Sequence, residues 1–282
     1  MLEKVDCLNR PFRGQAPAGS IALERDGHYV LRGEYSSSEI GLLRAAIEAV
    51  YDTFPPDPRD GRTSSANAAM FRYEMFNRAA ACQWAIERPA VLAILEPLLG
   101  GDCHVISCTA WRNPPGNEHA PRGQEWHIDG GPHVPREEGV SWPTAIPYPV
   151  FVVATHVYLE DVRIEDGPTA VVPGSHTTGQ VPPSEHVWSI ELGWGGRTSE
   201  PHLVRAGDVG FFVSDVWHRR LPPATNSRGR FFLQTNYGRR DIAQRIRPTS
   251  AVNHVDSAAI ARATTDRQRR LLGLHPQTFY DG

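Results

Sequence analysis

A short segment of the chain places two potential metal ligands next to each other. His127 and Asp129 lie within residues 125–130 and are separated by one residue. In a strand, residues two apart share a face with Cα atoms about 6.5–7 Å apart, so both side chains could reach one ion. The pair alone is a weak signal, because a chain with 12 histidines forms such triplets by chance.

A candidate third ligand lies 89 residues after Asp129. His218 follows the apolar run 209–213, which has the composition of a buried strand. Two histidines and one carboxylate on one face form the triad that holds non-haem Fe(II) and leaves coordination positions open. An oxidant and a chelating co-substrate need such positions. His127, Asp129 and His218 therefore predict a non-haem iron site.

Two arginines after His218 could bind an anionic co-substrate. Arg230 opens an apolar run that ends at Tyr237, and Arg228 lies two residues earlier. A guanidinium group in apolar surroundings suits a carboxylate, because its planar fork donates two parallel charge-assisted hydrogen bonds. Either arginine could equally be a surface cation at the beginning of a strand, and the spacing does not decide between these alternatives.

The elements that must position these residues change in character near residue 102. Before that point the pattern is mainly helical: Ser36 and Glu39 form a capping box ahead of apolar residues at helical spacing, and further helices are predicted at 76–87 and 89–98. After it, short β-branched and aromatic runs follow one another without intervening helices, which indicates an antiparallel barrel or sandwich. These runs are 104–111, 151–159, 170–172, 209–213 and 230–237.

We predict one domain over residues 1–282, mainly β with flanking helices. N-terminal helices over about 1–100 are expected to support a β core over about 101–240, and a helical tail follows over about 241–282. Two long connections, 130–149 and 177–203, interrupt the core. Loops of this length in a compact β domain are more often functional than idle.

The composition excludes several classes of protein. The formal net charge of −3 opposes binding to nucleic acid through a basic surface. The chain contains neither a membrane-spanning apolar stretch nor a secretory signal, so we expect a cytoplasmic protein with no membrane partner, as a monomer or small homo-oligomer. The cysteines have no zinc spacing and are expected to be reduced thiols; they are Cys7, Cys82, Cys103 and Cys108.

Several motifs resemble the phytanoyl-CoA dioxygenase family of Fe(II)- and 2-oxoglutarate-dependent oxygenases. They appear in the order typical of the family and extend over about residues 20–240. The Pro-Gly-Ser-His and Gly-Asp-Val blocks are far more specific than a His-x-Asp triplet. The motifs are the opening 24–33, the metal segment 126–129, residues 166–176, the block 206–209 with Trp217-His218, and Asn226-Ser227 leading to Arg230.

The resemblance implies a double-stranded β-helix, the jelly-roll or cupin-like fold, with iron at one mouth. It implies that the catalytic iron ligands are His127, Asp129 and His218. Asp129 also bears on the reaction, since halogenases of this superfamily carry Gly or Ala at the carboxylate position. We therefore expect oxygen chemistry, in which O2 and 2-oxoglutarate are consumed, succinate and CO2 are released, and a C–H bond is hydroxylated. Desaturation, epoxidation and ring formation use the same site and stay open.

The resemblance also implies how 2-oxoglutarate is held. Arg230 is similar to the arginine that binds the distal carboxylate, although its spacing from His218 is one residue longer than in many relatives. Arg228 has the same strand parity and is the alternative anchor. Gln124 is similar to a glutamine that some relatives place against 2-oxoglutarate.

The substrate is expected to be a small organic molecule. Phytanoyl-CoA is disfavoured because no basic cluster accompanies the motifs, and ectoine because residues 125–134 do not match that branch of the family. His133 is a possible substrate contact, whereas His156 is expected to be a hydrogen-bonded core residue and His176 to shape a turn. Tryptophans in the long loops could form an aromatic lid, although each could instead pack in the core. They are Trp142, Trp188 and Trp194.

Three other functions fit part of the pattern. A zinc hydrolase could use the same three ligands, but hydrolysis gives no role to Arg230. A non-catalytic β-helix binding module would not need a complete triad. A nucleic-acid demethylase of the wider superfamily is opposed by the net charge of −3.

Overall fold

Two antiparallel sheets of unequal size face each other in the computed structural model, which describes residues 16–55, 70–140, 142–244 and 255–276. The larger sheet has six strands in the order β1-β9-β4-β11-β3-β2, and the smaller has three in the order β10-β5-β8. This is the double-stranded β-helix that the sequence predicts. The strands of the two sheets are β1 (His28–Leu31), β2 (Phe71–Arg72), β3 (His104–Asn113), β4 (Val152–Tyr158), β5 (Thr169–Val171), β8 (Glu200–Pro201), β9 (Val209–Val213), β10 (His218–Arg220) and β11 (Arg230–Gly238).

Residues alternate between the two faces of the larger sheet. In β11, Phe231 and Leu233 point to the outer face and join the main apolar core, whereas Arg230, Phe232 and Gln234 line a cavity on the inner face. This follows from the period of two in a strand. A single strand therefore supplies both the packing that stabilises the sheet and the polar groups that face the site.

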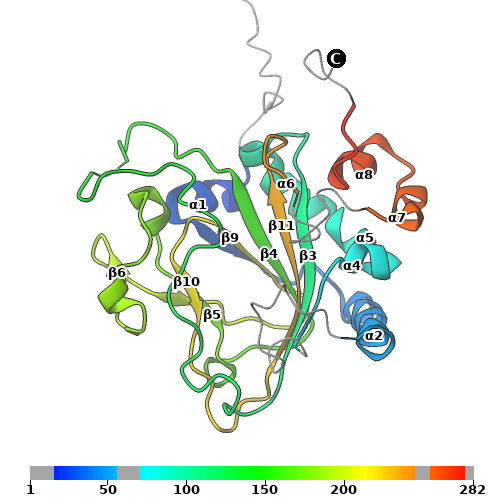
Figure 1. The fold of residues 1–282 in the computed structure, drawn as a ribbon, viewed down its shortest axis with the longest axis horizontal. Coiled ribbons are helices and arrows are strands. Elements are labelled where there is room, and N and C mark those ends of the chain that lie inside the picture. Colours follow the sequence, from blue (N-terminus) through cyan, green and yellow to red (C-terminus); the bar gives the residue numbers. More distant parts are fainter. Residues whose placement is uncertain (1–15, 56–69, 141, 245–254, 277–282) are drawn as a thin grey trace, which may run out of the picture.

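Most of the helices cover the outer face of the larger sheet, on the right and at the top in Figure 1, whereas α1 (Ala18–Asp26) is drawn on the left. The longest begins with the capping box that the sequence predicts, in which Ser36 and Glu39 satisfy each other's backbone N–H groups. No helix among the described residues is long and apolar enough to cross a membrane. The helices are α1 (Ala18–Asp26), α2 (Ser37–Thr53), α4 (Met75–Arg78), α5 (Ala80–Ile86), α6 (Pro89–Leu99), α7 (Ser257–Arg262) and α8 (Asp266–Leu271).

The N-terminal part of the chain is not purely helical. Strand β1 pairs with β9, and β2 pairs with β3, so both edges of the larger sheet come from the first hundred residues. The helix expected at 76–87 is broken into α4 and α5 at Ala79, which has extended dihedral angles. The sequence predicts a short strand at 29–32, which corresponds to β1, but it missed β2 and the break at Ala79, because edge pairing and a one-residue break depend on contacts far away in the chain.

The cysteines and the second long connection can also be located in the fold. Cys82, Cys103 and Cys108 are free and buried, as expected, whereas Cys7 lies outside the described residues. The connection 177–203 contains a short hairpin of β6 (Gly193–Trp194) and β7 (Arg197–Thr198).

Candidate metal centre

His127, Asp129 and His218 converge at one mouth of the β-helix, with ligand atoms all within 4.8 Å of one another. The Asp129 Oδ1 atom lies 3.5 Å from His218 Nε2 and 4.0 Å from His127 Nε2. Since metal–ligand bonds to nitrogen and oxygen are about 2.0–2.2 Å long, small side-chain rotations would bring all three onto one ion. The three residues predicted from sequence are therefore brought together.

The backbone explains the convergence. His127 forms an isolated bridge with His218, the first residue of β10, and Asp129 is held by its N–H, which donates to the Ser214 carbonyl at 3.0 Å. Asp129 itself lies outside any strand. The strand geometry assumed for the triplet thus holds only at His127, and a turn brings the carboxylate to the same place.

Both imidazoles are oriented so that Nε2 is the metal-binding atom. Nδ1 of His127 lies 2.7 Å from the Glu125 carbonyl, and Nδ1 of His218 lies 2.9 Å from the Val216 carbonyl. A carbonyl only accepts, so each Nδ1 carries the proton and each Nε2 presents a lone pair. Backbone carbonyls commonly orient metal-binding histidines in this way. The donor set therefore fits a divalent metal.

The charges of the three ligands suit a metal at neutral pH. Partial burial and the nearby His218 lower the pKa of His127 to about 4, so this ring is neutral. Burial opposes ionisation of Asp129, but His218 outweighs it and brings the pKa of the carboxyl down to about 2. Burial acts against protonation of His218 too, yet Asp129 raises its pKa.

A cavity of about 1020 Å³ extends from the triad between the two sheets. Its walls combine apolar rings, among them Trp111, Phe212 and Phe232, with a few polar side chains. This volume lies at the upper end of the range for sites that bind small molecules. The cavity can hold a co-substrate and a small organic substrate together.

Arg230 lines this cavity and is 4% exposed. Its Nε donates to Asn113 Oδ1 at 3.1 Å and its Nη1 to Thr169 Oγ1 at 3.2 Å. Burial, and after it the charge of Arg220, hold the pKa of Arg230 well below its usual range. No carboxylate pairs with this guanidinium within the described part of the chain. The side chain of the predicted anchor is thus oriented by two neutral residues, Asn113 and Thr169.

Arg228 does not share the orientation of Arg230, and the expectation that both face the same way is wrong. Its side chain is 54% exposed, and its Nη2 lies 3.7 Å from Asp166 Oδ2. Gly229 lies between the two arginines with φ +86°, so the chain turns there before β11 begins. Strand parity therefore does not extend back to Arg228.

Gln124 and His133 both line the cavity. The Gln124 N–H donates to the Arg220 carbonyl at 3.0 Å, which fixes its backbone beside β10. His133 is held by Asp215, which lies 2.5 Å from its Nδ1 and also accepts its backbone N–H. Tyr148 donates to the same carboxylate at 3.0 Å. Asp215 thus anchors both ends of the 130–149 connection, three residues before the ligand His218.

The three loop tryptophans do not form the expected lid, because none of them lines the cavity. The Trp142 indole N–H donates to a carbonyl within its own loop. Trp188 lies under an arginine guanidinium, and Trp194 packs against Trp217. The tryptophan that lines the cavity is Trp111, which belongs to a strand rather than to one of the long loops.

Two polar residues of the cavity were missed. His156 is buried as expected, but its Nδ1 has no hydrogen-bond partner among the described residues, so it is not the satisfied core histidine we anticipated. Burial and then Arg230 lower its pKa well below the usual value, which keeps it neutral. Arg220 is 5% exposed and also lines the cavity. Its position two residues after His218 in a strand was the available signal, since i and i+2 share a face.

Comparison with known proteins agrees with this geometry. The model of the Phytanoyl-CoA dioxygenase (PhyH) family matches residues 23–229. The chain belongs to the phytanoyl-CoA dioxygenase family. An L-proline trans-4-hydroxylase from Streptomyces griseoviridis is 29% identical over 157 residues, which are 56% of this chain and 54% of that enzyme. This match spans about half the length of the relative.

Solved structures of similar proteins share the fold of this family member. One is the epimerase SnoN in complex with Fe3+, alpha ketoglutarate and nogalamycin RO, with a TM-score of 0.60, 19% identity, and coverage of 80% of this chain and 84% of that one. Another is HygX from Streptomyces hygroscopicus with nickel and 2-oxoglutarate bound, with a TM-score of 0.56, 18% identity, and coverage of 77% and 84%.

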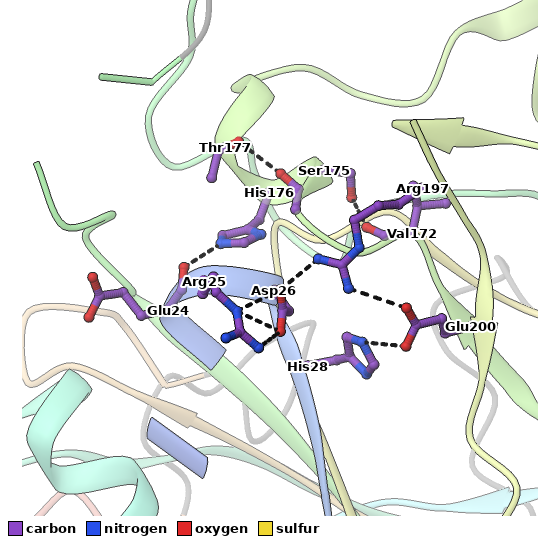
Figure 2. Close-up of polar contacts among 11 residues, drawn as sticks. Glu24, Arg25, Asp26, His28, Val172, Ser175, His176, Thr177, Arg197 and Glu200 are labelled. Atoms are coloured by element: carbon purple, nitrogen blue, oxygen red, sulfur yellow. Dashed lines mark hydrogen bonds and ion pairs between the residues drawn. The ribbon is translucent and has the colours of Figure 1, made fainter. Parts of the chain in front are cut away.

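The Pro-Gly-Ser-His block that carries much of the family likeness has a structural role (Figure 2). The Ser175 hydroxyl accepts the N–H of Trp217, the residue before the ligand His218, at 2.8 Å. His176 Nε2 lies 2.9 Å from the Glu24 carbonyl and so joins this turn to the end of α1. Gly27 is required there, because its φ is +79° and a Cβ would lie 2.7 Å from His176 Nδ1. The block therefore fixes the backbone next to His218, one of the three candidate metal ligands.

Proposed function

We propose that the protein is an Fe(II)- and 2-oxoglutarate-dependent dioxygenase that hydroxylates a C–H bond of a small organic substrate. The observation that carries the proposal is the convergence of two correctly oriented imidazoles and one carboxylate above a cavity that also contains a buried, unpaired arginine. This combination is the facial triad of non-haem iron oxygenases together with an anchor for a second carboxylate.

Each residue has a defined task in this proposal. His127, Asp129 and His218 hold Fe(II), and the carbonyls behind the two imidazoles keep their lone pairs directed at it. Arg230, oriented by Asn113 and Thr169, binds the distal carboxylate of 2-oxoglutarate. An Fe(II) ion held there would supply the activation of O2 that converts 2-oxoglutarate to succinate and CO2 and inserts one oxygen atom into a substrate C–H bond.

The cavity walls also support the proposal. Aromatic rings around the site exclude water, which protects the reaction from unproductive side reactions. Gln124 and His133, near the mouth, are placed to contact 2-oxoglutarate or the substrate. The family relative that hydroxylates proline favours hydroxylation, and its name points to a small molecule as substrate.

A zinc hydrolase is the rival with the same ligand set. It would need neither Arg230 nor Arg220, although each places a costly unpaired cation in the cavity wall. Hydrolysis therefore leaves the most unusual residues of the site unexplained. The oxygenase gives Arg230 a counter-ion.

The test is an anaerobic titration of the full-length protein with Fe(II) and 2-oxoglutarate, followed through the visible charge-transfer band of the chelate. We expect a band in the wild type and none in Asp129→Ala. Asp241→Ala is the matched control, because Asp241 also lines the cavity but lies outside the triad. Absence of the band in the wild type, with tight zinc binding, would overturn the proposal. Candidate substrates are then screened for stimulated release of succinate, and mass spectrometry of the product separates hydroxylation (+16 mass units) from desaturation or ring formation.

A further inference from the structure

Arg220 is a buried cation without a partner. It is 5% exposed, its Nε has no hydrogen-bond partner among the described residues, and no described carboxylate lies within ion-pair distance. A buried guanidinium without a counter-ion is costly, and such groups are normally paired.

The neighbouring Arg219 is also buried, but its guanidinium has hydrogen-bond acceptors. Arg219 is 1% exposed, and its Nη2 donates to the Arg122 carbonyl at 2.7 Å while its Nη1 donates to the Trp188 carbonyl at 3.2 Å. The guanidinium of Arg219 is thus satisfied by loop carbonyls. Arg220 faces the cavity and has no such acceptors.

Arg220 and Arg230 approach the same point from different sheets. In the ladder between β10 and β5, Arg220 lies opposite Thr169. The Thr169 hydroxyl accepts a hydrogen bond from Arg230 Nη1 at 3.2 Å. Two like charges thus lie in one region of a buried wall.

The described acids of this cavity cannot neutralise the pair. They are Asp129, which belongs to the triad, and Asp241, which is exposed. Arg220 lies two residues after His218 in β10, opposite Thr169 of β5. An anion that reaches both guanidinium groups would therefore lie beside Thr169.

We propose that Arg220 is a second anchor for 2-oxoglutarate, so that one distal carboxylate is held between Arg220 of the smaller sheet and Arg230 of the larger sheet. This inference rests on the proposed 2-oxoglutarate dependence. The two oxygens of a carboxylate offer about four acceptor positions, enough for two guanidinium forks. Succinate keeps the same carboxylate, so the pair would also retain the product.

The test compares two oxo acids that differ only at the far end. Both 2-oxoglutarate and 2-oxobutyrate chelate Fe(II), but 2-oxobutyrate lacks the distal carboxylate. Their Kd values are measured anaerobically on the full-length Fe(II) protein from the charge-transfer band and by calorimetry. For Arg220→Gln we expect the Kd of 2-oxoglutarate to rise by about ten-fold or more, while the Kd of 2-oxobutyrate is unchanged.

Two further variants complete the experiment. Arg220→Lys keeps the positive charge but loses the planar guanidinium fork, so we expect a Kd for 2-oxoglutarate between those of the wild type and Arg220→Gln. This conservative variant also serves if Arg220→Gln does not fold. Arg228→Gln removes an exposed arginine outside the cavity and should match the wild type.

The possible results distinguish a failure of the Arg220 anchor from a failure of the 2-oxoglutarate dependence. A wild-type Kd for 2-oxoglutarate in Arg220→Gln overturns the second anchor alone, and loss of only substrate-stimulated turnover in that variant would assign Arg220 to the substrate instead. Equal weakening of both oxo acids would mean that Arg220 supports the fold rather than the distal carboxylate. If the wild type forms no complex with either acid, the 2-oxoglutarate dependence itself fails.

Discussion

His127 and His218 exchange both of their backbone hydrogen bonds, each N–H donating to the other's carbonyl at 3.0 Å. In an antiparallel pair this reciprocal exchange puts the two side chains on the same face. Their ring centroids are consequently 4.3 Å apart although 91 positions separate the residues in the chain. Two of the three ligands are thus positioned by the backbone ladder itself.

Metal binding should stabilise the folded protein measurably. Because a ligand that binds only the folded state adds free energy of unfolding, a metal at about 100 times its Kd contributes about 2.7 kcal/mol. We expect Mn(II), as a redox-stable substitute for Fe(II), to raise the thermal unfolding midpoint of the wild type and to have no effect on His218→Ala. His119→Ala is the control, since His119 is an exposed cavity residue outside the triad. An unchanged response in His218→Ala would contradict the assignment.

Replacing Arg230 should affect the co-substrate more than the metal. Loss of a buried charged partner costs on the order of 2–5 kcal/mol, so Arg230→Ala should raise the half-saturating 2-oxoglutarate concentration by about 30-fold or more. The Mn(II)-induced shift in unfolding midpoint should stay near the wild-type value. Arg228→Ala is the comparison, and a larger effect of that variant in succinate-release assays would show the anchor to be misassigned.

The unsatisfied imidazole of His156 should lower the stability of the folded protein, and we expect it to contact a ligand in the cavity. His156→Phe keeps a ring beside Phe232, whose centroid is 4.4 Å away, but removes a buried polar group with no partner. Removing an unsatisfied polar group of this kind should stabilise the protein by about 1–3 kcal/mol in chemical denaturation. If the imidazole contacts a ligand, affinity for 2-oxoglutarate or substrate should fall in the same variant. A destabilised variant with normal binding would indicate a structural role.

Asp215 should make stability depend on pH. Burial opposes its ionisation, but contacts with His133 and Tyr148 lower the pKa of this carboxyl below its usual value. A lowered folded-state pKa means that the carboxylate contributes stability above its unfolded value of about 3.9 and loses it as the pH falls through the folded value. Asp215→Asn should therefore cost about 1–3 kcal/mol at pH 7.

Unfolding experiments at two pH values check this sign. The difference between Asp215→Asn and the wild type should shrink at pH 3 relative to pH 7. Asp161→Asn is the control, because this exposed carboxylate only accepts a backbone N–H at Ala206. A difference that is constant with pH would contradict the proposed origin of the stability.

Much of the site could be predicted from the chain alone. The triplet His127-x-Asp129, the distant His218 and the arginine that opens the last core strand are local patterns in the sequence. Strand periodicity places the side chains of His218 and Arg230 on the inner face, whereas Asp129 reaches the site from outside any strand. The capping box at Ser36 was equally readable, since it depends on residues three apart.

Other features were decided only by tertiary structure. Gly229 with its positive φ separates Arg228 from Arg230, and the loop tryptophans found partners away from the cavity. The orphan imidazole of His156 and the unpaired guanidinium of Arg220 could not be recognised either. A sequence specifies which face of the sheet a strand residue occupies, because successive side chains of a strand alternate between the two faces. Whether a buried polar group meets a partner depends on segments that lie far away in the chain, and folding alone brings these together.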